Sequence, residues 1–152
     1  MRFLMTSTTL TEIERITEPT EELLKFLRVE MPLLSEKFGN KFNPHKCALG
    51  VMIEKGVFLV GRYKGEIRGI MIAWLYKSPL DIDTTILQQQ LFYVKPDSGR
   101  TAFLLFHKFI DIGKNEANHI ITMLTSHSNI KSSTLRRWGF KELETLYRME
   151  VS

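Results

Sequence analysis

The stretch of sequence that decides the fold reads Val94-Lys95-Pro96-Asp97-Ser98-Gly99-Arg100-Thr101-Ala102-Phe103-Leu104-Leu105-Phe106. It joins the apolar run 91–94 to an amphipathic helix through a loop of small residues. The first amides of a helix have no intrahelical acceptor and lie at the positive end of the helix dipole. The junction therefore predicts an anion site over Ser98, Gly99, Arg100, Thr101 and Ala102, where small side chains leave room and Arg100 adds a permanent charge.

The residues that follow predict a strand–helix–strand crossover. Apolar residues recur at helical spacing from Ala102 to Ile112, which predicts a helix over 99–114 with one buried face. The next apolar run, 119–124, is typical of a short buried strand. Two strands joined by one helix form a right-handed parallel crossover, so we expect these strands to lie parallel.

The residues before the stretch predict an antiparallel hairpin and a third strand. Strands are expected over 57–63 and 66–76, with Lys64-Gly65 as the tight turn between them, and over 85–94. Because the strand over 66–76 is apolar along most of its length, we expect the sheet to be covered on both faces.

The two ends of the chain complete the predicted α/β (α+β) fold. A first strand is expected over 8–16, then a helix starting near Pro19, which Pro32 kinks or divides. A helix from Pro44 is expected to turn its apolar residues inward, namely Cys47, Ala48, Val51 and Met52. A helix over 130–138 and a strand over 146–151 end the chain. We expect one domain over residues 1–152, with a mixed, mostly antiparallel sheet of six to seven strands and helices on both faces.

The composition excludes several classes of protein. No apolar run approaches the ~20 residues of a membrane span, and the N-terminus lacks the pattern of a signal peptide, so a cytoplasmic protein is expected. The single cysteine excludes an internal disulfide, and the four scattered histidines predict no metal site. The net charge of +4 includes a basic C-terminal end that could attract nucleic acid or a small polyphosphate. Nucleic-acid binding rests on that charge alone and ranks last.

Three local patterns resemble the GCN5-related N-acetyltransferase (GNAT) superfamily. Val94-Lys95-Pro96 and Gly99-Arg100-Thr101-Ala102 are similar to the two parts of its central V-x-P-x-x-R-G-x-G-x-G/A signature, with two loop residues missing. Arg137-Trp138-Gly139-Phe140-Lys141 resembles the end of its second signature, and Ile67-Arg68-Gly69 resembles its I-x-G segment. The segments 91–94 and 146–149 look like those of bacteriophage-borne members, which would place the protein in the host cytoplasm.

The resemblance implies an enzyme that transfers the acetyl group of acetyl-coenzyme A directly to the amine of a small molecule or protein. The residues that it implies for binding acetyl-coenzyme A are Phe92, Tyr93, Val94, Ser98, Gly99, Arg100, Thr101 and Ala102. In this interpretation a backbone amide of the strand over 85–94 supports the oxyanion, and amides of the following loop hold the pyrophosphate.

The chain departs from the family at the residues that move protons. Leu135 stands where many members carry a tyrosine acid, and Gln90 lies near the place of a glutamate base. Leucine has no ionisable proton, and an amide is not a base near neutral pH. His127 is the remaining candidate for a general base or for the wall of the acceptor pocket. The alternative is a catalytically silent domain of the same fold that binds or assembles with a partner, either a second copy or another protein.

Overall fold

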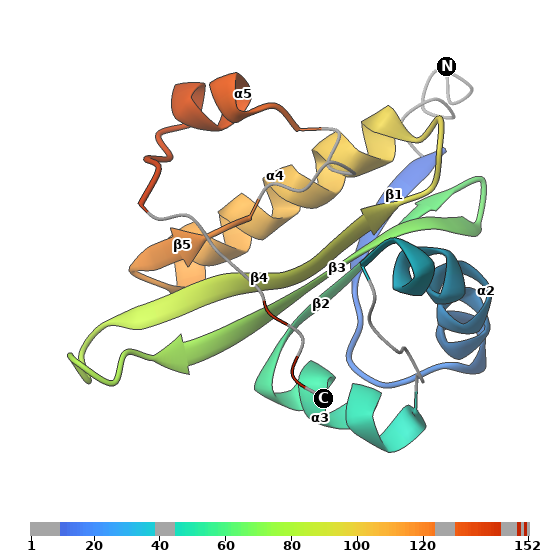
Figure 1. Ribbon diagram of the computed structural model, residues 1–152, viewed down its shortest axis with the longest axis horizontal. Coiled ribbons are helices and arrows are strands. Elements are labelled where there is room, and N and C mark those ends of the chain that lie inside the picture. The colour runs from blue at the N-terminus through green and yellow to red at the C-terminus, as the bar shows by residue number, and fades with distance from the viewer. Residues whose placement is uncertain (1–9, 39–44, 124–129, 144–148, 150, 152) are drawn as a thin grey trace, which may run out of the picture.

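The computed structural model describes residues 10–38, 45–123, 130–143, 149 and 151, and shows helices packed on a twisted sheet (Figure 1). Its helices and strands follow in chain order: β1 (Thr11–Arg15), α2 (Glu21–Phe38), α3 (Lys46–Lys55), β2 (Gly56–Tyr63), β3 (Glu66–Lys77), β4 (Thr85–Val94), α4 (Gly99–Glu116), β5 (His119–Ile121) and α5 (Ser132–Arg137).

The sheet follows chain order, β1-β2-β3-β4-β5. The first four strands are antiparallel neighbours, and β5 lies parallel to β4 after the α4 crossover. Lys64 and Gly65 turn the β2–β3 hairpin with positive φ angles of 51° and 82°, the signature of a type I′ turn. The predicted hairpin and the predicted parallel crossover are therefore both confirmed.

Alternate residues of the central strands contribute to two separate hydrophobic cores. In β2, Leu59 belongs to the core beneath α4, whereas Phe58 and Val60 belong to the core that α2 and α3 share. The side chains that these helices bury include Leu105, Phe106 and Phe109 of α4, Leu23, Leu24 and Leu27 of α2, and Leu49 of α3. This alternation follows from the period of two in a strand, which sends successive side chains to opposite faces.

Two glycines let the first turns of α4 lie directly against the sheet. A Cβ atom on Gly61 of β2 would come within 2.4 Å of Thr101 Cγ2, and one on Gly69 of β3 within 3.0 Å of Leu105 Cδ1. Any side chain at Gly61 would therefore push α4 away. The contact fixes where the N-terminus of α4 stands over the sheet.

Several expectations about the elements need correction. The described residues form five strands. The strand expected over 146–151 lies largely outside them, so the expectation of six or seven strands stays a prediction. Pro32 does not divide α2, which runs from Glu21 to Phe38. In α3, Leu49 is buried and Met52 packs partly buried against the same core, as expected for Met52. Ala48 and Val51 are instead exposed, because the helix begins at Lys46 and turns a different face to the sheet, and the side chain of Cys47 lies outside the described part of the chain.

Candidate functional site

Strands β4 and β5 separate part of the way along β4. β4 pairs with β3 over its whole length but with β5 only at Ile86, Leu87 and Gln88. At the next residue the side-chain carbonyl of Gln89 accepts hydrogen bonds from the Thr122 hydroxyl and, at 3.4 Å, from the Met123 amide. Within the described residues, the edge of β4 from residue 90 to 94 has no neighbouring strand on that side.

A β-bulge in β4 decides which backbone groups face this open edge. Ile72 pairs with Leu91 and Ala73 with Gln89, so Gln90 is the extra residue. Beyond it, the Lys95 amide donates to the Arg68 carbonyl at 2.8 Å, on the β3 side. Because backbone groups alternate between neighbours along an antiparallel strand, Tyr93 faces β3 and the N–H groups of Phe92 and Val94 face the open edge.

The loop between β4 and α4 is held by an arginine of β3. Arg68 Nε donates to the Ser98 hydroxyl at 2.9 Å, and Arg68 Nη2 donates to the Pro96 carbonyl at 3.1 Å. Asp97 between them adopts a positive φ of 61°, which turns the chain toward the helix. The signal for Arg68 in the sequence was its place in the Ile67-Arg68-Gly69 segment, but its contact with the loop was not expected.

The N-terminus of α4 presents fewer free amides than the sequence suggested. Ser98 is the N-cap residue, yet its hydroxyl makes no capping hydrogen bond, because it is engaged with Arg68. The amide of Ala102 already donates to the Ser98 carbonyl at 3.0 Å. The amides left without an intrahelical acceptor are those of Gly99, Arg100 and Thr101.

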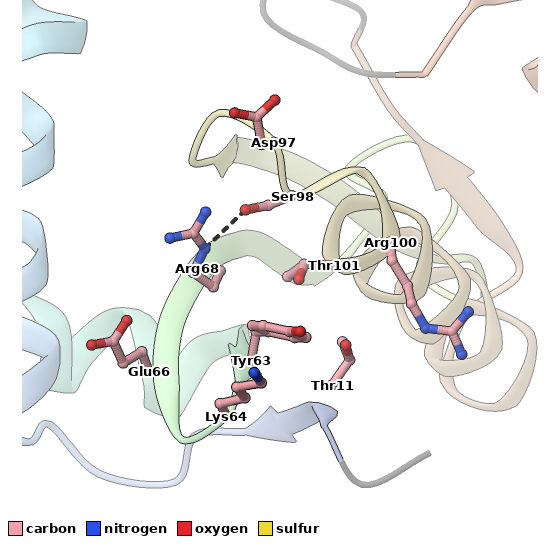
Figure 2. A pocket seen from close by; sticks show the side chains of 9 residues that line it. All are labelled: Thr11, Tyr63, Lys64, Glu66, Arg68, Asp97, Ser98, Arg100 and Thr101. Atoms are coloured by element: carbon pink, nitrogen blue, oxygen red, sulfur yellow. Dashed lines mark hydrogen bonds between the residues drawn. The ribbon is translucent and has the colours of Figure 1, made fainter. Parts of the chain in front are cut away.

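The side chains of the predicted anion site fall into two groups. Gly99 and Arg100 are exposed at the start of α4, whereas Ser98, Thr101 and Ala102 are buried. An open cavity of about 710 Å³ lies beside this junction on the side of β1 and the β2–β3 turn (Figure 2). Its lining residues are Thr11, Tyr63, Lys64, Glu66, Arg68, Asp97, Ser98, Arg100 and Thr101.

A buried carboxylate pairs with Tyr93 on the other face of β4. The Tyr93 hydroxyl donates to Glu30 Oε2 of α2 at 2.7 Å, and Lys95 Nζ lies 3.6 Å from Glu30 Oε1. Burial, reinforced by the hydrogen bond and the charge of Glu30, raises the pKa of Tyr93 to about 12. The sequence analysis missed Glu30, although its position seven residues after Leu23 on the apolar stripe of α2 was the available signal.

The two positions at which the resemblance to the GNAT superfamily would place an acid and a base hold no ionisable group. Leu135 is buried in the core beneath α5, and Gln90 is exposed at the bulge. His127 lies outside the described residues. Among the described residues, no three histidine, cysteine, aspartate or glutamate side chains gather where they could hold a metal ion, and no helix is long and apolar enough to cross a membrane.

Solved structures of acetyltransferases share this architecture. An aminoglycoside acetyltransferase, HMB0005, from an uncultured soil metagenomic sample superposes with a TM-score of 0.65 at 17% identity, covering 93% of this chain and 99% of its own. A second, meta-AAC0020, from such a sample and in complex with sisomicin, gives a TM-score of 0.64 at 13% identity, covering 95% and 97%. A predicted acetyltransferase from Clostridium acetobutylicum, solved with acetyl-CoA, gives 0.62 at 8% identity, covering 92% and 96%.

The chain has an acetyltransferase fold. No family model matches the sequence, and no curated protein matches it. The acetyltransferase fold confirms the α+β class and the GNAT-like arrangement expected from the sequence. In this fold the open edge of β4 and the β4–α4 loop lie next to each other at the same end of the sheet (Figure 1).

Proposed function

We propose that the chain is an acetyl-CoA-dependent N-acetyltransferase that acts as one domain over residues 1–152 and acylates an amine by direct transfer. The observation that carries the proposal is the open edge of β4, which runs into a loop and a helix N-terminus with unsatisfied amides. The similar structure from Clostridium acetobutylicum, which was solved with acetyl-CoA, supports acetyl-CoA as the cosubstrate. The cytoplasmic location and the bacteriophage origin stay predictions.

The two parts of the site suit the two parts of coenzyme A. The pantetheine arm contains amide groups, and the backbone groups of Phe92 and Val94 on the open edge can pair with them as a neighbouring strand would. The pyrophosphate is an anion that suits the free amides of Gly99, Arg100 and Thr101. Arg100 contributes its charge beside them.

The reaction requires placement of the amine and support of the developing charge. The amine nitrogen attacks the thioester carbon, a C–N bond forms, and the carbonyl oxygen becomes an oxyanion. Collapse of this intermediate breaks the C–S bond, the amine proton leaves, and the thiolate takes up a proton. An edge amide of β4, such as that of Phe92, would donate to the oxyanion, and holding both reactants together contributes much of the rate.

Proton transfer is the step that this chain supports least. With Leu135 and Gln90 unable to exchange protons, water or His127 has to serve, at a cost of roughly 10²–10⁴ in rate. The phenol of Tyr93 keeps its proton at neutral pH because its pKa is raised to about 12. It therefore cannot act as the base.

The second candidate function is a catalytically silent domain that binds coenzyme A or a protein partner. The absence of an ionisable group at both Leu135 and Gln90 favours it. A silent domain that binds coenzyme A would differ from the enzyme only in turnover, whereas one that binds a protein partner would not need to bind the cofactor.

Calorimetry with acetyl-CoA, followed by turnover assays, separates these functions. We expect saturable acetyl-CoA binding and acetylation of at least one amine in a panel that includes aminoglycosides, since two of the similar folds are aminoglycoside acetyltransferases. A nucleic-acid duplex serves as the control for charge alone, because its binding weakens steeply with salt. Binding without turnover of any amine would favour the silent domain. No binding of acetyl-CoA would exclude the enzyme and a silent domain that binds coenzyme A, and would leave only a silent domain that binds a protein partner.

A further inference from the structure

Two threonine hydroxyls in the cavity beside α4 have no hydrogen-bond partner among the described residues. Thr11 of β1 is 8% exposed and Thr101 of α4 is 3% exposed, and both line the cavity. Within the residues that the structure describes, neither hydroxyl has a hydrogen-bond partner. Both residues are largely buried, yet their hydroxyls are not among the fully enclosed polar atoms, so each remains accessible from the cavity that it lines. Polar groups largely removed from bulk water usually bind protein, water or a ligand, so we expect these two hydroxyls to bind a group inside the cavity.

The packing of α4 fixes the orientation of the Thr101 hydroxyl. Thr101 Cγ2 would lie 2.4 Å from a Cβ atom on Gly61, so the methyl branch of Thr101 faces β2. The hydroxyl occupies the other branch of the same Cβ atom. Figure 2 shows Thr11 rising from β1 toward the same space below α4.

Two cations and a phenol border the same space. Lys64 Nζ lies 5.4 Å from the centroid of the Tyr63 ring, and neither Lys64 nor Arg100 forms an ion pair within the described residues. In Figure 2, the side chains of Tyr63, Lys64 and Arg100 gather around Thr11, whereas Asp97 and Glu66 stand apart from them at the other side of Arg68 and of the hairpin turn.

We propose that this cavity is a second anion site, which binds a phosphoryl or sulfate-like oxyanion through side chains. Hydroxyl donors beside cations that form no close ion pair within the described residues favour an oxyanion, because hydrogen bonds from charged donors to an anion are the strong ones. Glu66 and Asp97 also line the cavity but stand on its other side (Figure 2). The donors would be Thr11, Tyr63, Lys64, Arg100 and Thr101. The site goes beyond the proposed acetyl transfer, because Thr11, Tyr63 and Lys64 belong to β1, β2 and the β2–β3 turn, away from the edge of β4 that faces β5.

The test is a titration with inorganic phosphate at constant ionic strength, followed by amide chemical shifts or calorimetry. We expect saturable binding that weakens about tenfold in Thr11→Val, which keeps the shape of the side chain and removes the hydroxyl. Lys64→Met should weaken it similarly, and Lys108→Met, which removes an exposed lysine of α4 outside the cavity, should not. No saturable phosphate binding would overturn the proposal. Equal binding by wild type, Thr11→Val and Lys64→Met would also overturn it, by placing the anion on the amides of α4.

Competition between coenzyme A and phosphate shows whether the oxyanion that fills the site belongs to coenzyme A or to another molecule. If a phosphoryl group of coenzyme A fills the site, it will displace phosphate, and Thr11→Val will weaken both ligands. If phosphate and coenzyme A bind together, the site takes a free or separately carried phosphoryl group; either result supports the site. Thr11-dependent phosphate binding in a protein that binds no acetyl-CoA would leave this site standing and exclude the proposed acetyltransferase.

Discussion

Arg68 of β3 donates a hydrogen bond of 2.9 Å to the hydroxyl of Ser98, the N-cap residue of α4. Arg68 is also the extra residue of a β-bulge, since Gly61 pairs with Gly69 and Arg62 with Ile67. The bulge directs Arg68 at the loop, and the bond draws the Ser98 hydroxyl away from the helix amides that it would otherwise cap. One contact thereby positions the loop and leaves the first amides of α4 without a side-chain cap from Ser98.

Replacing Arg68 should weaken cofactor binding more than it weakens the fold. In Arg68→Met the bonds to Ser98 and Pro96 are lost, the loop is no longer held, and Ser98 is free to cap α4. We expect about a tenfold loss of acetyl-CoA affinity by calorimetry, with a small change in the free energy of unfolding. Arg28→Met, at an exposed arginine of α2, is the matched control. Equal affinities in the two variants would show that Arg68 does not organise the site.

Two glycines should respond in opposite ways to the same substitution. A Cβ atom on Gly99 meets no atom within 4 Å, so Gly99→Val should fold normally, place bulk before the free amides of α4 and abolish acetyl-CoA binding. A Cβ atom on Gly61 would come within 2.4 Å of Thr101, so Gly61→Val should lower the free energy of unfolding by about 1–3 kcal/mol or more. Urea unfolding and calorimetry on both variants check this. Unchanged affinity in Gly99→Val would move the cofactor away from this loop.

Tyr93 should ionise unusually late in an alkaline titration. Its pKa is raised to about 12, first by burial and then by Glu30, so the folded state favours the neutral phenol. That stabilisation is fully present below the unfolded pKa of about 10 and is lost as the pH rises through 12. Phenolate absorbance should show one of the four tyrosines ionising near pH 12, and Tyr93→Phe should remove that phase. The unfolding free energy of wild type should fall relative to Tyr93→Phe over this range; parallel curves would contradict the assignment.

His107 should be a site where a less polar ring stabilises the protein. Its Nε2 is buried without a hydrogen-bond partner, and its ring lies 4.3 Å from that of Phe103 and 4.8 Å from that of Trp138. His107→Phe keeps the aromatic contacts and removes the unsatisfied nitrogen, so the free energy of unfolding should rise by about 1 kcal/mol. Urea denaturation measures the change. A loss of stability would indicate that a ligand or water normally satisfies this nitrogen.

If the protein turns over, its rate should rise with pH. With Leu135 and Gln90 unable to exchange protons, the fraction of deprotonated amine limits the reaction. We expect His127→Ala to lower the rate by less than Gly99→Val does, because water can replace a weak base. A pH–rate profile on both variants checks this, and a rate that His127→Ala reduces to that of Gly99→Val would make His127 the base.

The hairpin, the crossover and the strand–loop–helix junction could be predicted from the sequence because each depends on neighbours in the chain. Lys64-Gly65 specifies its turn through two adjacent residues, and the spacing of Leu105 and Phe109 specifies the buried face of α4. The prediction that Ala48 and Val51 face inward was wrong. In a short helix with few polar residues, the sequence marks neither the first residue nor the buried face clearly.

The sequence by itself determined the order of helices and strands, the hairpin turn and the small residues at the start of α4. Only the tertiary structure decided that Gln90 bulges, that Arg68 reaches Ser98 thirty residues away, and that Glu30 meets Tyr93 across 63 residues. The physical reason is that strand register and helix position depend on how all the layers pack together. Local sequence patterns determine whether a segment forms a helix or a strand. A site built from several elements forms only when those elements pack against one another in one register.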